Sequence, residues 1–124
     1  MGTESGLIMN ILSDLNTLLT GLGFNVATAV YKDNPPDEYI VIEPTRDVFL
    51  GHADNKPRFE SQGAEISLFT RGSFIDRKDI IIGALMRDNY KIPLRDYLGV
   101  DNDAGLYHYV IGVVKAYGLT AYGA

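Results

Sequence analysis

Two strand-like segments near the middle of the chain constrain its fold more than any other feature. Tyr39–Glu43 and Ala64–Thr70 are both rich in residues that favour strands. Between them lies a polar, charged segment, Pro44–Gly63, which is too long for a tight hairpin turn. A loop of that length in a compact domain is usually functional or disordered, so we expect this segment to be an exposed loop that makes contacts.

Helices are expected before and after this central region. Apolar residues recur at helical spacing from Leu7 to Leu22 and predict an amphipathic helix that ends at Gly21 or Gly23. Ser73 and Asp76 resemble a capping box and predict a second helix over Phe74–Asn89. Its expected buried face consists of Ile75, Ile81, Ile82, Leu85 and Met86.

Three further strands complete the expected fold. Phe24–Tyr31 is a short strand, a weak strand follows the second helix, and Leu106–Tyr117 is the strongest strand signal in the chain. Leu119–Ala124 is expected to fray. The order of these elements predicts a single α+β domain over residues 1–124, with one antiparallel sheet, two helices packed mainly on one face, and a long loop between the central strands.

Charge and composition exclude several classes of protein. The 124 residues carry a net charge of −5, which is unfavourable for wrapping nucleic acid. The chain has no cysteine, so disulfides and cysteine-ligated metals are excluded. No apolar run is long enough to span a bilayer, and the first residues lack the basic region of a secretory signal. We therefore expect a protein that is cytosolic at synthesis and does not bind membranes.

No motif for catalysis, metal binding or cofactor binding is present. His52 and His108 are far apart in the sequence and belong to neither an HxH nor an HExxH pattern. Asp101-x-Asp103-x-Gly105 resembles the start of a calcium loop, but the twelfth position of such a loop is Gly112. We expect no catalytic residue, no metal and no cofactor, and we interpret the chain as a protein that is not an enzyme.

The expected long loop supplies the candidate contact residues. Charges of both signs alternate along it, and large apolar side chains lie among them. Such side chains on an exposed loop would form an apolar patch unless a partner subunit covered them. The predicted subunit or partner contacts are Arg46, Asp47, Phe49, Leu50, Asp54, Lys56, Arg58 and Phe59.

The order of motifs resembles the tail-completion or tail-terminator proteins of long-tailed bacteriophages and prophages. The resemblance begins with an amphipathic helix that ends in Leu18-Leu19-Thr20-Gly21-Leu22-Gly23-Phe24. A proline-containing connector leads to the Tyr39–Ile42 strand, and Ile66–Thr70 follows the long polar segment. A helix near Asp76, an Asp-x-Asp turn and a tyrosine-rich last strand complete a pattern that covers about Leu7 to Tyr117.

This resemblance implies an architectural function rather than chemistry. Proteins of that family assemble as a hexameric ring between the tail tube and the head connector, and the loop between Glu43 and Gly63 would line the lumen or reach a neighbouring subunit. DNA would pass through the acidic lumen without specific binding. The expected location is the host cytoplasm during assembly and then the head–tail junction of the virion. The alternatives are a minor capsid or head-completion protein, a small α+β binding module unrelated to phages, and an enzyme whose site is assembled in space.

Overall fold

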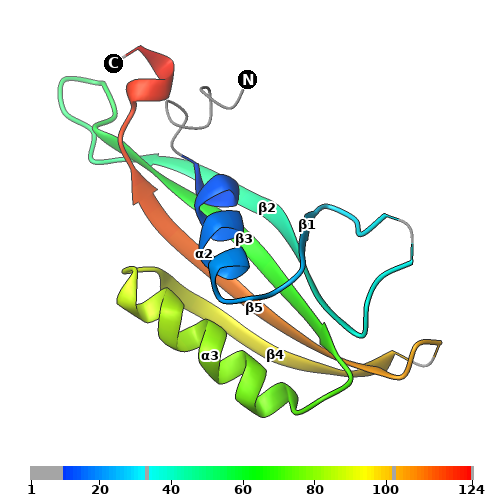
Figure 1. The fold of residues 1–124 in the computed structure, drawn as a ribbon. Helices are drawn as coiled ribbons and strands as arrows, with labels where there is room; N and C mark the ends of the chain where they lie inside the picture. Colours follow the sequence, from blue (N-terminus) through cyan, green and yellow to red (C-terminus); the bar gives the residue numbers. More distant parts are fainter. Residues whose placement is uncertain (1–9, 33, 102, 124) are drawn as a thin grey trace.

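The computed structural model describes residues 10–32, 34–101 and 103–123 (Figure 1). In chain order the described elements are α2 (Ile11–Gly21), β1 (Val26–Thr28), β2 (Glu38–Leu50), β3 (Phe59–Thr70), α3 (Phe74–Arg87), β4 (Lys91–Asp101), β5 (Leu106–Tyr117) and the 3₁₀ helix η1 (Thr120–Tyr122). The strands form one sheet in the order β1-β2-β3-β5-β4. The expected α+β class is confirmed. Among the described residues, no helix is long and apolar enough to cross a membrane.

The hydrophobic core lies on one face of the sheet, between the strands and the two helices (Figure 1). Alternate residues of β2, β3 and β5 point toward α2 and α3, because successive side chains of a strand point to opposite faces. The largest fully buried side chains are Leu15, Leu19, Ile40, Ile42, Ile66, Leu68, Ile81, Leu85, Ile111, Val113 and Thr70. We call this side the helix face of the sheet and the other side the open face.

Both helices begin and end with local signals that the sequence carries. The side chain of Asn10 accepts a hydrogen bond from the backbone N–H of Ser13 at the start of α2 (2.8 Å). Gly23 has a φ of +96° and follows the end of α2, where the Phe24 N–H donates to the Leu19 carbonyl (3.2 Å). This is the Schellman arrangement, in which a left-handed residue closes the last turn.

The same cap closes α3, with asparagine in place of glycine. Asn89 has a φ of +64°, and the Tyr90 N–H donates to the Leu85 carbonyl (3.0 Å). The predicted N-cap of this helix is confirmed, because the Ser73 hydroxyl accepts from the Asp76 N–H (3.4 Å). The residues Leu7 and Ile8, with which the first helix was expected to begin, lie outside the described residues.

The prediction of a purely antiparallel sheet is wrong at one edge. β1 is parallel to β2, with Val26 opposite Ile40, whereas the other neighbouring strands are antiparallel. β1 is also shorter than the expected strand over Phe24–Tyr31. The chain leaves β1 through a long connector that contains Pro35 and Pro36, which gives it room to return to the start of β2.

The prediction of a long loop from Pro44 to Gly63 is also wrong, because most of this segment forms strand. β2 continues to Leu50, β3 begins at Phe59, and Leu50 lies opposite Phe59 in a continuous antiparallel pair. A bulge between Pro44 and Asp47 shifts the register. The distal part of β2 is exposed on both faces, so its sequence lacks the alternation by which a half-buried strand is recognised.

Three smaller expectations also need correction. In α3 the buried side chains include Ile81 and Leu85, but Ile75 and Met86 are exposed. Each follows a residue of the buried face, Phe74 and Leu85, and one residue is about 100° around the helix, so both point away from the core. β4 is a strand of 11 residues rather than a weak one. The C-terminal tail is held in place as η1, whose Tyr122 hydroxyl donates to Glu60 (3.1 Å).

Replacing Leu15 by Ala is expected to lower the free energy of unfolding by about 2–5 kcal/mol, because this side chain is fully buried between α2 and the sheet. Urea denaturation followed by circular dichroism measures the change. Thr17→Ala, on the exposed side of the same helix, is the control and should change stability by less than about 0.5 kcal/mol. A loss below about 1 kcal/mol for Leu15→Ala would contradict the packing described for α2.

Candidate assembly interface

The predicted contact residues all lie on one projecting structure, the distal part of the β2–β3 hairpin. We call residues 46–60 the arm. Its tip is a tight turn in which Ala53 and Lys56 exchange two backbone hydrogen bonds (2.8 and 3.0 Å). Asp54 and Asn55 at the centre of this turn both have positive φ, which is the signature of a type I′ hairpin turn. The arm is thus a paired hairpin rather than an irregular loop.

The strand pairing divides the predicted residues between the two faces of the arm. Asp47 lies opposite Gln62 and Phe49 opposite Glu60, and both positions belong to the helix face. Leu50 and Phe59 lie opposite each other on the open face. The other four do not join either group: Arg46 lies in the bulge, and Asp54, Lys56 and Arg58 lie at the tip.

Large apolar side chains are exposed on both faces of the arm. Phe49 is 48% exposed and Val48 41% exposed, and Leu50 and Phe59 are exposed as well. Phe49 packs edge-on against the ring of Tyr122 (5.7 Å between ring centroids), which enlarges the patch on the helix face. Because contiguous apolar patches on soluble proteins usually mark contact sites, the arm is the strongest candidate interface of the described residues.

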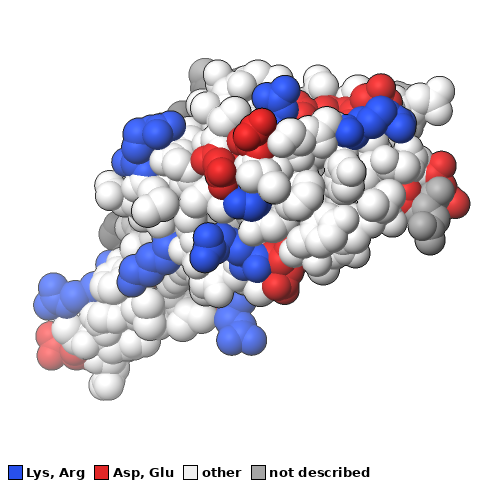
Figure 2. All heavy atoms as spheres, turned by 90° about the horizontal axis from the view of Figure 1, so that it is seen from below, with Lys and Arg blue, Asp and Glu red and all other residues white. Residues whose placement is uncertain are grey.

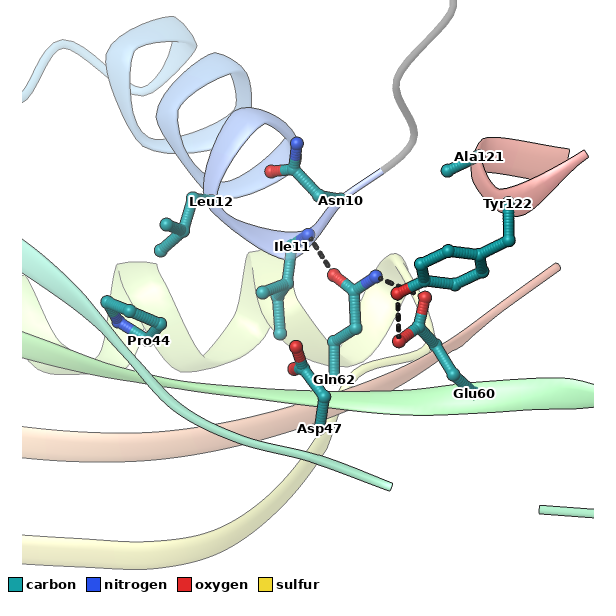
Figure 3. A pocket seen from close by; sticks show the side chains of 9 residues that line it. All are labelled: Asn10, Ile11, Leu12, Pro44, Asp47, Glu60, Gln62, Ala121 and Tyr122. Carbon is teal, nitrogen blue, oxygen red and sulfur yellow. Dashed lines mark hydrogen bonds between the residues drawn. The ribbon is translucent and has the colours of Figure 1, made fainter. Parts of the chain in front are cut away.

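A buried polar network holds the base of the arm against α2 and η1 (Figure 3). The side chain of Gln62 accepts from the backbone N–H of Ile11 (2.7 Å) and donates to Glu60 (3.1 Å). Glu60, only 3% exposed, also accepts from the hydroxyl of Tyr122. Figure 3 shows these groups around a hollow of about 280 Å³ that Asp47 also lines. The base of the arm is therefore held by two other segments of the chain, α2 and η1.

A second tyrosine strengthens the same end of the molecule. The Tyr117 hydroxyl, at the end of β5, donates to the Asp14 carboxylate of α2 (2.6 Å). Burial, followed by this hydrogen bond, raises the pKa of Tyr117. Burial also raises the pKa of the neighbouring Tyr90 to about 12. Both phenols therefore stay neutral at physiological pH and serve as structural groups.

Sequence reasoning missed one exposed apolar residue of the arm, Val48, and the three residues that anchor its base. Val48, Glu60, Gln62 and Tyr122 were not among the predicted contact residues. Val48 adjoins Phe49 and Leu50 in an apolar triplet, which was a usable signal. No signal marked Gln62, since its partner Ile11 is 51 residues away in the sequence.

The open face carries a row of aromatic rings and the second candidate site. Tyr39 stacks on Phe69 (4.8 Å between ring centroids), Phe69 stacks on His108 (4.2 Å), and Tyr31 packs against Tyr39. These rings line a shallow hollow of about 410 Å³. The Nε2 atom of His108 is buried and has no hydrogen-bond partner among the described residues.

Glu43 and Glu65 line this hollow together with His108, but the buried Nε2 atom of His108 makes no hydrogen bond to either carboxylate. His108 lies opposite Phe69, and Glu65 lies four residues along β3, so their backbones are about 13 Å apart along the strand. Burial has the larger effect and lowers the pKa of His108, but the charge of Glu65 nevertheless acts on His108 and raises it. His52 is exposed in the hairpin tip, away from this hollow. In the part of the chain that the structure describes, no group of three or more His, Cys, Asp or Glu residues is arranged to hold a metal ion.

The chain matches no protein-family model, and no curated protein matches its sequence.

Replacing Gln62 by Ala is expected to cost about 1–3 kcal/mol of stability, because the buried Ile11 N–H and the Glu60 carboxylate each lose a partner. Chemical denaturation measures the loss. Asn16→Ala removes a hydrogen bond to Thr20 at an exposed position and serves as the control, with an expected change below about 0.5 kcal/mol. Equal effects of the two substitutions would show that the network does not stabilise the base of the arm.

Stability is expected to decrease as the pH falls below about 6.5, because burial lowers the pKa of His108 in the folded state from its ordinary value of 6.5. Glu65 and Asp101 oppose this shift only in part. Above pH 6.5 the His108 imidazole is neutral in both the folded and the unfolded protein. Below pH 6.5 the imidazole of the unfolded chain binds a proton first, which favours unfolding.

Urea midpoints between pH 7.5 and pH 5.5 test this expectation. His108→Phe keeps an aromatic ring against Phe69 but cannot be protonated, so its stability should depend less on pH than that of the wild type. His52→Gln, at an exposed position, is the matched control and should keep the wild-type slope. An unchanged slope in His108→Phe would assign the pH dependence to other groups.

Proposed function

We propose that this chain is a structural protein of the phage or prophage head–tail junction, a tail terminator or tail-completion protein that acts by assembling into a ring. The observation that carries the proposal is the arm: a paired hairpin with apolar side chains exposed on both faces. Contact between such apolar side chains and water is unfavourable in free energy, and burial against a second subunit removes that contact.

The arrangement of the sheet also favours assembly. β1 pairs only with Ile40–Ile42, so the rest of β2 borders no other strand on that side among the described residues. β4 forms the opposite edge of the sheet. Edges of this kind offer backbone groups for contact with another chain. Contacts between unlike edges of successive copies are the kind that closed rings of more than two subunits require.

The remaining features agree with the resemblance described for the sequence. The net charge of −5 suits a channel that lets DNA pass without binding to it. The expected partners are further copies of the chain, the tail tube and the head connector, and the location is the host cytoplasm and then the virion junction. A minor capsid or head-completion protein would use the same kind of surface and is the nearest alternative.

A small binding module is the alternative that a separate observation favours. The aromatic row of the open face lines a hollow of about 410 Å³, which is within the size range of small-ligand sites. Such a module would remain a monomer or dimer and would use the open face rather than the arm. The oligomeric state therefore distinguishes the two functions.

The purified chain is expected to form six-fold rings at high concentration, which negative-stain electron microscopy and sedimentation velocity detect. The double substitution Phe49→Ser and Leu50→Ser should abolish the rings but change the folding free energy by less than about 2 kcal/mol, because both side chains are exposed. Val30→Ser, which alters an apolar side chain that is 59% exposed outside the arm, is the matched control and should leave the rings intact.

A stable monomer or two-fold dimer at all concentrations would count against ring assembly and favour the binding module. The genes that surround the coding sequence give an independent test. Neighbouring genes for a terminase, a portal protein and a major tail protein would support the junction role. A neighbourhood without any virion gene would contradict it.

A further inference from the structure

A second apolar surface lies at the opposite edge of the sheet from the arm. Ile82, Met86, Tyr90, Ile92 and Arg95 line a groove of about 340 Å³ between α3 and β4, which we call the α3–β4 groove. Met86 at its rim is 65% exposed, more than any other large apolar side chain described. An unbranched, polarizable methionine at a rim adapts readily to an incoming aromatic ring.

Positive charge surrounds this groove. Arg87 ends α3 and Arg95 lies on the helix face of β4, both at exposed positions, while the acidic Asp88 follows Arg87. The Nζ atom of Lys115 lies 4.5 Å from the centre of the Tyr90 ring, which lines the groove. Figure 2, which views the molecule from the side where α3 and β4 lie in Figure 1, shows several Lys and Arg side chains in a row, with Asp and Glu side chains beside it. The acidic Asp96 follows Arg95 in the strand and thus belongs to the other face of the sheet.

The helix face of the arm has the complementary chemistry. Asp47 and Phe49 lie on this face of β2, and the carboxylate of Glu60 and the ring of Tyr122 lie beside them around a small hollow. This face is therefore acidic and aromatic, whereas the α3–β4 groove is basic and aliphatic. The two surfaces match in charge and in apolar character.

The positions of the two surfaces exclude a contact within one molecule and favour one between molecules. The arm extends β2 and β3 beyond the short strand β1, whereas the groove borders β4, the last strand of the sheet order. Neighbouring strands are rotated by about 20–25°, so the three steps from β2 to β4 turn these two strands by roughly 60–75° relative to each other. Surfaces on one side of the sheet therefore point in different directions at its two edges, which permits a head-to-tail contact.

We propose that the helix face of the arm of one copy binds in the α3–β4 groove of the next copy, with Phe49 against Met86 and Asp47 facing Arg95. The occupant of the groove is thus a second copy of this chain. The contact is heterologous, so each copy offers an arm to one neighbour and a groove to the other, and repetition of the contact leads to a ring or a filament. This inference rests on the proposed assembly function and adds the pair of surfaces that would carry it.

Charge exchange tests the pairing of Asp47 with Arg95. Asp47→Arg and Arg95→Asp should each weaken self-association at least about tenfold in sedimentation velocity, because like charges then face each other. The two substitutions in one chain should restore the association to within about threefold of the wild type, because the pair is re-formed with reversed signs. Asp103→Arg makes the same charge change in the β4–β5 turn and is the matched control, expected to associate like the wild type.

Cysteine trapping tests the same contact without relying on charge or on strong association. Because the chain has no cysteine, Phe49→Cys and Met86→Cys introduce the only thiols. A chain with both substitutions should form a ladder of disulfide-linked multimers under mild oxidation, since heterologous contacts propagate. A chain with Phe49→Cys alone should stay monomeric on a denaturing gel, as should a control chain that combines Phe49→Cys with Thr17→Cys.

Disulfide dimers of the Phe49→Cys chain would show a two-fold contact between arms and would overturn the proposal. Absence of a ladder from the double-cysteine chain, or failure of the reversed charge pair to restore association, would overturn it as well. Six-fold rings that persist in Asp47→Arg would refute this pairing of surfaces while leaving the assembly function intact. Absence of rings from the wild type, together with a gene neighbourhood without virion genes, would instead remove the assembly function.

Discussion

The strands β2, β3, β4 and β5 are much longer than the helices that cover them, and the exposed arm follows from that difference. β2 has 13 residues and α2 has 11. At about 3.3 Å per residue the strand is roughly 43 Å long, whereas at 1.5 Å per residue the helix is roughly 16 Å long. Two short helices on one face cannot cover a sheet of this length. The uncovered part of β2 and β3 becomes the arm, and the other face of the sheet remains open.

The exposed part of the hairpin keeps a fixed position because polar groups attach it to the covered part. Gln62 is the central residue of this attachment, since it joins the first turn of α2 to Glu60, and Glu60 in turn accepts from Tyr122. Buried polar groups of this kind are costly unless each finds a partner, so the geometry at the base of the arm is closely specified. A rigid arm loses little conformational entropy when it binds, which favours its use as a contact surface.

The parts of the fold that sequence analysis predicted correctly are those with local causes. The hydrophobic spacing of α2, the Ser73 cap of α3 and the alternation of β5 each specify structure through interactions within a few residues. The arm was mistaken for a loop because both of its faces contact water and no alternation marks a strand there. The Asp54–Asn55 pair at its tip was the local signal that could have corrected this, since both residue types tolerate positive φ.

The sequence by itself determined the class of the fold, the two helices, the strongest strands and the set of exposed apolar and charged side chains near the middle of the chain. Only the tertiary structure decided that β1 runs parallel to β2, that the arm is a paired hairpin, and that Gln62 meets the start of α2. These features join residues that are far apart in the chain. Their positions depend on which parts of the strands and helices stay exposed once the core is packed. Patterns within a few neighbouring residues do not specify that.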